Sequence, residues 1–522
     1  MTMTTLKPLP LGIQTFEKII EGNFLYVDKT ALVYEIANSY QYVFLSRPRR
    51  FGKSLLCSTL KSYFEGRRDL FEGLAIEHLE NEWRQHPVLL FSLSTAKGGT
   101  VKDFNERMGS QLSLYEEQYG LSGCGDLMPG VRLENLIKKS SAVNGEKAVV
   151  IIDEYDAPML TVLHDRENLE AMRIAIRSFF SCLKDCDPYL RFVFLTGVSK
   201  FSQLSIFSEL NNLAKISMMP RYSTICGITQ EELESSLLPW VEQLADKRQL
   251  TLEETFRILK RYYDGYHFAE DLRGVYNPVS LLSAFDAGKI SDYWFDTATP
   301  SFLISMLKEF NTDIRELEGT IAKANDFDAP AENVKSVVPL FYQSGYLTIK
   351  DYNQAGDIYT LDIPNQEVRM GLFYNLTPYY VCDNTLRTNS AILKATMSIL
   401  GGDLDEALRI YQSFLSSIPY AENATSEGHF QTLLYLLFSL LGDTTDLQTE
   451  VRTATGRIDM LLGTKTDLYV IELKINQTAQ IALEQIDQKG YLLPFKDDDR
   501  RLHKVGINFS TGKRTLDDWI IK

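Results

Sequence analysis

One segment near the N-terminus places a strand, a glycine-bearing loop and a helix in a fixed order. The apolar run Tyr42–Ser46 leads directly into RPRRFGKS, Arg47–Ser54, and then into the helix-compatible run LLCSTLKSYF. Backbone N–H groups at such a loop and at the following helix start can hold phosphates. Lys53 would add positive charge at the β- and γ-phosphates, and the Ser54 hydroxyl could hold Mg²⁺. The residues expected to contact a nucleotide here are Arg50, Phe51, Gly52, Lys53, Ser54 and Leu55.

The usual phosphate-loop pattern, GxxxxGK[ST], has glycine where this chain has Arg47, so a helix cap is the structural alternative for GKS. A second motif supports the phosphate site. The run AVVIIDEYD ends a predicted strand on Asp153 and Glu154, where ligands bind in open α/β sheets. Asp153 can bind Mg²⁺ through water, and Glu154 can polarise the water that attacks the γ-phosphate. The two motifs in this order favour a site for ATP and Mg²⁺. The alternative is that GKS is a helix cap and that DEYD is a solvated strand end.

Four short apolar runs recur in the first half of the chain, separated by segments of helical period. Each run is apolar on both faces, which is typical of parallel strands covered by helices on both sides of a sheet. Thr196, at the end of the fourth run, occupies a polar position that could sense the γ-phosphate. A strand-end threonine that starts a turn is the equal alternative. The runs are Tyr42–Ser46, Val88–Ser92, Ala148–Asp153 and Phe192–Thr196.

Three arginines, Arg47, Arg49 and Arg50, crowd the phosphate loop. They could help to neutralise phosphate or contact a partner, and solvated surface charge is an equal alternative for each. No arginine finger can be assigned.

The chain of 522 residues is too long for one ordinary core. After Pro239 the pattern becomes helical and aromatic, and the region near Tyr342–Pro364 favours a short strand pair, so we expect a helical region with a small β-wing. Helices return from about residue 389, and strands, a helix and a strand follow from Leu447. No long linker separates these parts. The expected domains are 1–238, 239–388 and 389–522.

Charge and composition limit the partners and the compartment. The net charge of −15 argues against coating nucleic acid by bulk electrostatics, but Val451–Lys522 holds 12 Lys and Arg against 10 Asp and Glu. The six scattered cysteines predict reduced core thiols, including Cys182 and Cys186, rather than disulfides or a zinc site. The first residues lack a signal-peptide pattern, and no apolar run approaches the ~20 residues that span a bilayer. We therefore expect a cytoplasmic protein with no membrane association.

A second constellation lies in Gly456–Lys474, which has the pattern of a hairpin. If Thr464–Asp467 is a four-residue loop, Asp459 falls opposite Glu472, on the face that also carries Lys474, and the other face is apolar. Directly opposed Cβ atoms lie ~4.5–5.5 Å apart, where like charges repel, so the pair would favour a hard cation such as Mg²⁺. Lys474 could orient an attacking water. The alternative is an exposed amphipathic hairpin with ordinary surface charges.

Several N-terminal motifs together resemble the bacterial AAA-ATPase-like family. They are YVDKT, SRPRRFGKS, VVIIDEYD, FLTGVSKFS and NNL, and they lie within roughly the first 240 residues. The resemblance implies a P-loop NTPase domain, and Arg47 is part of how this family departs from the general phosphate loop. We interpret Asp28 and Thr30 as a helix cap first and a nucleotide contact second.

The C-terminal region, from about 391 to 510, resembles the PD-(D/E)XK nuclease superfamily. The resemblance implies a C-terminal α/β domain with Asp459 as the first acidic residue, Glu472 and Lys474 as the ExK element, and Gln485 on the next helix. Asp459 and Glu472 would bind the metal, and nucleic acid would be the substrate. Glu427 matches an acidic residue often found on the first helix of such domains.

The leading hypothesis is therefore an ATPase whose nucleotide cycle controls a Mg²⁺-dependent nuclease. The alternative is a nucleotide-driven switch or scaffold that binds a protein partner, or a second copy of itself, without nuclease chemistry. A small-molecule kinase is disfavoured because Glu154 suits water activation. His267 and His429 are left unassigned, since a lone histidine among aromatic residues is usually part of a core.

Overall fold

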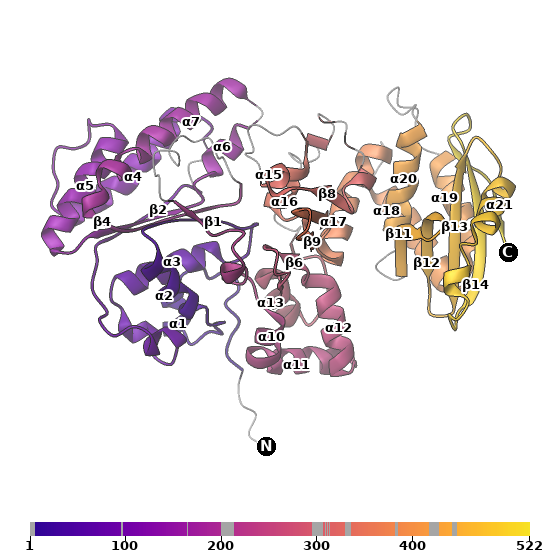
Figure 1. Ribbon diagram of the computed structural model, residues 1–522, viewed down its shortest axis with the longest axis horizontal. Coiled ribbons are helices and arrows are strands. Elements are labelled where there is room, and N and C mark those ends of the chain that lie inside the picture. Colours follow the sequence, from indigo (N-terminus) through magenta and orange to yellow (C-terminus); the bar gives the residue numbers. More distant parts are fainter. Residues whose placement is uncertain are drawn as a thin grey trace, which may run out of the picture. The chain divides into compact units, whose positions relative to one another are not determined.

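The computed structural model describes residues 6–94, 98–163, 165–199, 213–294, 306–307, 310, 312, 314–328, 336–381, 385–416, 427–440 and 446–522. The chain forms two compact units (Figure 1). The first comprises Met1–Asp296 with Leu317–Asn365, and the second comprises Thr297–Glu316 with Gln366–Lys522. This division joins the middle region, through residue 365, to the N-terminal part. The two boundaries expected from the sequence, after residues 238 and 388, remain predictions.

The first unit is built on a five-stranded parallel sheet in the order β2-β3-β4-β1-β5. The four apolar runs expected as strands are confirmed. Because β4 lies between β1 and β3, the carboxyl ends of β1 and β3 lie on either side of β4 at one edge of the sheet. The strands are β1 Tyr42–Ser46, β2 Val88–Ser92, β3 Ala148–Asp153, β4 Leu190–Gly197 and β5 Ala214–Lys215.

Helices cover both faces of this sheet, as the apolar strands predict. In Figure 1, α1 to α3 lie on one side of the strands, and α4, α5 and α7 lie on the other. Cys182 and Cys186 are buried free thiols, in agreement with the expectation from their spacing. The helices are α1 Phe16–Glu21, α2 Thr30–Ser39, α3 Lys53–Phe64, α4 Val101–Gln118, α5 Pro129–Asn144, α6 Ala157–Thr161, α7 Arg166–Phe180 and α8 Cys182–Asp185.

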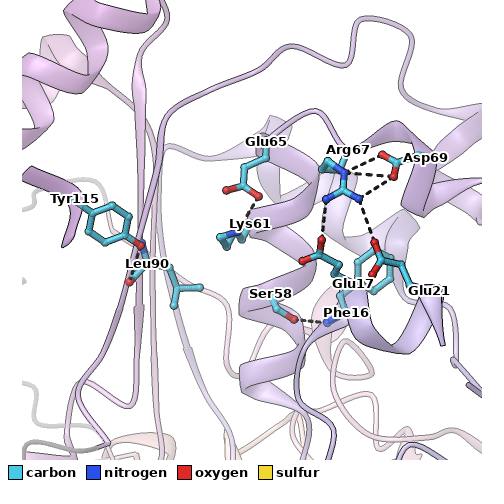
Figure 2. Close-up of polar contacts among 10 residues, drawn as sticks. All are labelled: Phe16, Glu17, Glu21, Ser58, Lys61, Glu65, Arg67, Asp69, Leu90 and Tyr115. Carbon is cyan, nitrogen blue, oxygen red and sulfur yellow. Dashed lines mark hydrogen bonds and ion pairs between the residues drawn. The ribbon is translucent and has the colours of Figure 1, made fainter. Parts of the chain in front are cut away.

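Polar contacts fasten α1 to α3, the helix that follows the phosphate loop (Figure 2). The backbone N–H of Phe16 donates to Ser58 Oγ on α3 at 2.9 Å. Arg67, just beyond α3, contacts Glu17 at 2.9 Å and Asp69 at 2.8 Å. Such partly exposed ion pairs contribute little individually, so the buried ring of Phe16 contributes most of the attachment. The packing of α1 thus holds α3 in place behind the loop.

The middle region combines helices with a small antiparallel sheet. The helices are α10 Gln230–Ser236, α11 Leu238–Arg248, α12 Leu252–Tyr263, α13 Pro278–Ala287, α15 Ala324–Phe327 and α16 Val338–Ser344. Thr229 and Thr251 begin α10 and α12 with capping boxes. The expected strand pair is present as β9 and β10, and β8, which the sequence did not indicate, pairs with β10. The strands are β6 Tyr266–His267, β7 Gly274–Val275, β8 Thr320–Ala322, β9 Thr348–Asn353 and β10 Ile358–Asp362.

The second unit contains helices and a five-stranded mixed sheet in the order β11-β12-β13-β14-β15. Only β13 and β14 are parallel, because α21 connects them. Helix α21 packs on β13 and β14, and α19 packs against β15. The elements are η6 Ile314–Glu316, α17 Gln366–Val381, α18 Thr385–Leu400, α19 Leu404–Ser416, α20 Glu427–Ser439, β11 Asp446–Thr453, β12 Gly456–Gly463, β13 Asp467–Ile475, α21 Ala479–Lys489, β14 Arg501–Ser510 and β15 Thr515–Ile521. Among the residues described in either unit, no helix is both long and apolar enough to cross a bilayer.

Candidate functional sites

The phosphate loop connects β1 to α3 at the carboxyl edge of the sheet. Gly52 precedes the first residue of α3 with φ 89°, and Arg50 also has a positive φ of 69°. A side chain at position 52 would meet no atom within 4 Å, so the backbone angle, rather than space, requires glycine there. The loop therefore turns sharply into the helix N-terminus, where backbone N–H groups point toward any anion bound there.

Lys53, the first residue of α3, is buried in this loop. Its Nζ donates to the carbonyl oxygens of Arg47 and Pro48, each at 2.9 Å. Burial lowers the pKa of Lys53, although the nearby charges of Asp156 and Asp153 act in the opposite direction. The ammonium is therefore already desolvated and lies close to the carboxylates at the end of β3.

Asp153 and Glu154 are placed as the sequence predicts, at and just after the end of β3. Asp153 is 7% exposed, and its Oδ1 has no hydrogen-bond partner among the described residues. Burial raises the pKa of Asp153, while a hydrogen bond from the Ser54 side chain lowers it. Ser54 and Asp153, the two predicted Mg²⁺ ligands, thus lie together. Glu154 beside them has φ 52°, a left-handed conformation.

Sequence reasoning missed the role of Asp156, three residues further on. Its buried Oδ2 accepts hydrogen bonds from the backbone N–H groups of Val198 at 3.0 Å and Ser199 at 2.6 Å. Burial raises the pKa of Asp156 to about 6. The last residue of the DEYD motif therefore fixes the chain that leaves β4. The available signal was this third acidic residue, which follows Asp153 and Glu154 in the spacing D-E-x-D.

Thr196 lies at the expected end of β4, but its hydroxyl is used within the sheet. The side chain is fully buried, and Oγ1 donates to the carbonyl of Leu45 in β1 at 2.8 Å. Asp28 and Thr30 are also used by the fold. Asp28 accepts from the backbone N–H of Thr30 at 2.8 Å and of Ala75 at 2.7 Å, which is the capping arrangement favoured over a nucleotide contact.

Arg47 is only 1% exposed, so the expectation that it is a solvated surface charge is wrong. Its guanidinium is buried and donates to three backbone carbonyls, those of Ser46, Ser217 and Tyr222. The reason is tertiary: two of these carbonyls come from residues some 170 positions later.

An apolar cavity beside the loop was also missed by the sequence reasoning. It has a volume of about 110 Å³ and adjoins Gly52 and Leu55. Its other walls come from three separate stretches of chain, near the N-terminus, after β5 and at the start of α13, so no single motif marks it. The lining includes Pro10, Leu25, Val27, Ile228, Pro278 and Leu282. Apolar lining next to a phosphate loop suits a planar base.

The second site lies on the β12–β13 hairpin. The strands pair from Gly463 with Leu468 to Met460 with Ile471, which confirms the expected register, and one further step puts Asp459 opposite Glu472. The Asp459 carboxylate accepts a hydrogen bond from the backbone N–H of Leu473 at 2.8 Å. Burial raises the pKa of Asp459, against the lowering effect of that hydrogen bond and of nearby cations, which include Lys474, Arg457 and Arg315.

Glu472 is the central carboxylate of this site and is only 2% exposed. Its Oε1 accepts hydrogen bonds from Lys474 Nζ, at 3.1 Å, and from the side-chain amide of Gln485 on α21. Its buried Oε2 has no partner among the described residues. Burial and then the charge of Asp459 raise the pKa of Glu472 to about 7. All four predicted residues of this site are therefore brought together.

The alternative interpretation assumed that the hairpin face with the carboxylates is exposed, and the structure shows that this face is buried. Leu461, Leu468 and Val470 on that face belong to a buried cluster with Leu483 and Ile486 of α21. The charged group lies at the end of this apolar contact. Sequence alternation marked one face as apolar, but a strand between two helical layers is buried on both.

The remaining candidates are His267, Glu427 and His429. His267 is half-buried, its Nδ1 lies 2.7 Å from the carbonyl of Ile349, and burial lowers its pKa, as expected for a core histidine. Glu427 is the first residue of α20, but its side chain and that of His429 lie outside the described residues. In the part of the chain that is described, no group of three or more His, Cys, Asp or Glu side chains could hold a metal.

Comparison with known proteins agrees with this geometry. Residues 10–207 match the AAA-ATPase-like family model, described as a predicted AAA-ATPase, and residues 425–519 match the PD-(D/E)XK nuclease superfamily. An uncharacterized protein in the vnfD 5′ region of Azotobacter chroococcum mcd 1 is 34% identical over 534 residues, covering 99% of each chain. The structure of the Aeropyrum pernix ORC2 protein aligns with 66% of this chain and 93% of its own chain, at 14% identity. The TM-score of 0.25 is too low to indicate a shared fold.

Proposed function

We propose that this chain, which belongs to the AAA-ATPase-like family and ends in a PD-(D/E)XK nuclease superfamily domain, hydrolyses ATP in its first unit and cleaves nucleic acid in its second. One observation carries the proposal. In each candidate metal site a buried carboxylate oxygen, Asp153 Oδ1 or Glu472 Oε2, has no partner among the described residues. Leaving such an oxygen unpaired costs free energy, and a divalent cation would offset that cost.

In the first unit, the base would occupy the apolar cavity and the phosphates would lie against the loop. Lys53 would exchange the carbonyls of Arg47 and Pro48 for phosphate oxygens, which are stronger, charged acceptors. Ser54 and Asp153 would hold Mg²⁺, which when bound neutralises phosphate charge. Glu154, directly after them, would orient and polarise the attacking water.

In the second unit, Asp459 and Glu472 would hold the metal, which when bound lowers the pKa of water and stabilises charge on a phosphodiester. Lys474, 3.1 Å from Glu472, would orient the attacking water or stabilise the negative charge that develops on the phosphate. Gln485 donates to one oxygen of Glu472, which would leave the other oxygen available to a metal. We further propose that the nucleotide state of the first unit controls this site.

The test measures ATPase and nuclease activity on one preparation with Mg²⁺, using plasmid and single-stranded substrates. We expect Lys53→Ala and Glu154→Gln to abolish ATP turnover, and Glu472→Gln to abolish cleavage while ATP turnover remains. Cleavage that persists in both Asp459→Ala and Glu472→Gln, or that is absent from the wild type in every nucleotide state, would rule out the nuclease half.

A second candidate is a nucleotide-driven switch that binds a protein partner and performs no nuclease chemistry. It is favoured by the net charge of −15 and by an apolar stripe on α18. On that helix Leu393, Met397 and Leu400, spaced on one face, are 64%, 65% and 48% exposed. This function predicts ATP turnover that depends on Lys53, no cleavage under any condition, and no effect of Glu472→Gln.

A further inference from the structure

Arg47 is the first residue of the phosphate loop, and its side chain leaves the loop for the middle region. One terminal nitrogen donates to the carbonyls of Ser46 at 2.9 Å and Ser217 at 2.8 Å, and the other donates to Tyr222 at 3.0 Å. The guanidinium also lies 4.2 Å from the centre of the Phe268 ring. The side chain is 1% exposed, so these protein contacts replace those with bulk water.

Other residues of the same loop contact the same region. The ring of Phe51 packs edge-on against Tyr266, at 4.8 Å between centres, and against Phe268, at 5.4 Å. Pro48 lies so close to Gly345, at the end of α16, that a Cβ there would approach it within 2.8 Å. The segment Tyr266–Phe268, which contains β6, and the end of α16 therefore pack against the loop.

The charge of Arg47 has no carboxylate to balance it. Burial lowers the pKa of Arg47, and the groups that raise it are Cys226 and Tyr342, with no acidic side chain among them. Burying a guanidinium costs free energy that its contacts must offset. Here the two terminal nitrogens donate to three carbonyls and the guanidinium lies against an aromatic ring, while the buried Nε has no hydrogen-bond partner among the described residues. A loop that needed only flexibility would keep the usual glycine at this position.

We propose that Arg47 is a positioning residue for the phosphate loop, whose planar guanidinium ties the loop to the Tyr222 turn and to the Phe268 segment. The conformation of the loop and that of the middle region are then set together. Lys53 also donates a hydrogen bond to the Arg47 carbonyl. A phosphate that takes Lys53 as its own donor would break this bond and so change the contacts of the residue that links the loop to the middle region. The inference rests on the proposed binding of ATP and adds the route by which binding reaches the middle region.

The test is hydrogen exchange on the full-length chain with and without Mg-ATP, in a Glu154→Gln background that slows turnover. In the parent we expect ATP to slow exchange in the peptide containing residues 263–268. In Arg47→Lys, which keeps the charge but loses the fork, and in Arg47→Gly, which restores the common pattern, ATP should still bind. The ATP-dependent protection of that peptide should fall about two- to thirtyfold, the usual range for a residue that carries coupling.

Arg221→Lys is the matched control, because Arg221 is an exposed arginine next to Tyr222 and should behave as the parent. If Arg47→Lys protects residues 263–268 as well as the parent, only the charge matters and the inference is overturned. If the Arg47 variants fail to fold, Phe268→Leu, which removes the ring beneath the guanidinium, should reduce the protection, and full protection there would also overturn it. If the parent does not bind ATP, the proposed function itself is wrong. That result is distinguishable from a parent that binds ATP but shows no effect of the Arg47 variants, which would overturn only this inference.

Discussion

The carboxyl group of Glu472 titrates near neutral pH because it is buried beside the charge of Asp459. A metal ligand must be deprotonated, so a bound cation has to displace a proton from this group below its pKa of about 7. Because burial raises the pKa of Glu472, its ability to bind a metal depends on pH in the neutral range.

We therefore expect the affinity of the second unit for Mn²⁺ to fall about tenfold per pH unit below pH 7 and to level off above it. Titration calorimetry of the nucleotide-free Asp153→Asn variant would isolate this site from the first one. Glu472→Gln should remove the binding at all pH values. A flat profile between pH 5.5 and 7 would contradict the assignment of Glu472 as a ligand.

Asp467, at the other end of β13, has the opposite behaviour. Burial would raise its pKa, but hydrogen bonds from Thr466, His503 and Arg501 outweigh burial and hold the pKa at about 2. A carboxylate with a depressed pKa stabilises the fold above its unfolded value near 4, and the contribution is lost as pH falls toward 2.

Asp467→Asn should lower the free energy of unfolding of the second unit by about 2 kcal/mol at pH 7 and by almost nothing at pH 2. Urea denaturation at the two pH values measures this. Asp487→Asn, whose side chain is 56% exposed, is the control and should change little at either pH. Equal losses for Asp467→Asn at both pH values would mean that packing, not charge, is responsible.

Which site residues were predictable depends on where their partners lie in the chain. Asp459 and Glu472 follow from one hairpin, whose loop length fixes the register, so local sequence suffices. The positions of Thr196 and Arg47 depend on carbonyls in other strands and turns, and sequence pattern carries no information about those contacts. Asp156 was missed because its partners, Val198 and Ser199, lie 42 and 43 residues later.

At the scale of elements, long apolar strands were identified and short or composite features were not. The buried strands of the first sheet carry continuous apolar runs, which is a strong signal. In contrast, β8 has only three residues and pairs with β10, nearly 40 residues away. The apolar cavity beside Gly52 draws on segments from three parts of the chain and therefore needs the tertiary fold to exist.

The contact of α21 with the sheet depends on Gly506 in β14, which pairs with Glu472. A Cβ at position 506 would lie 2.2 Å from the carbonyl oxygen of Ala479, the first residue of α21. Gly506→Ala should therefore displace α21, separate Gln485 from Glu472 and destabilise the second unit by about 1–3 kcal/mol.

For Gly506→Ala we expect nuclease activity and Mn²⁺ affinity to fall together while ATP turnover is unchanged. Gly512→Ala is a suitable control, because a Cβ there would come no closer than 3.8 Å to another atom. Wild-type Mn²⁺ affinity in Gly506→Ala would show that α21 does not position the metal site.

At the scale of the whole molecule, the chain passes between the two units after residues 296, 316 and 365. A boundary after residue 388, as expected from the sequence, would fall inside α18, and one after 238 would fall inside α11. Pattern alone could not show that residues 297–316 join the second unit.

A fragment of residues 389–522 should therefore be insoluble or aggregated, because it lacks α17, the first four residues of α18 and the η6 segment. A longer fragment that links 297–316 to 366–522 should be monomeric by size-exclusion chromatography and bind Mn²⁺. The fragment 366–522 alone should be less stable than the linked one, since the 1%-exposed side chain of Ile314 would be missing. A stable, monomeric 389–522 fragment would refute this division of the chain.

The placement of η6 in the second unit has a consequence during synthesis. Its contact helix α20 begins 111 residues after η6 ends, because η6 ends at Glu316 and α20 begins at Glu427. At translation rates of about 5–20 residues per second, α20 begins to emerge from the ribosome roughly 5–20 s after η6. The apolar side chain of Ile314 has no packing partner in α20 during that time. The nascent chain therefore carries an exposed, unmatched segment for longer than most small domains take to fold, and chaperone binding to the growing chain should concentrate there.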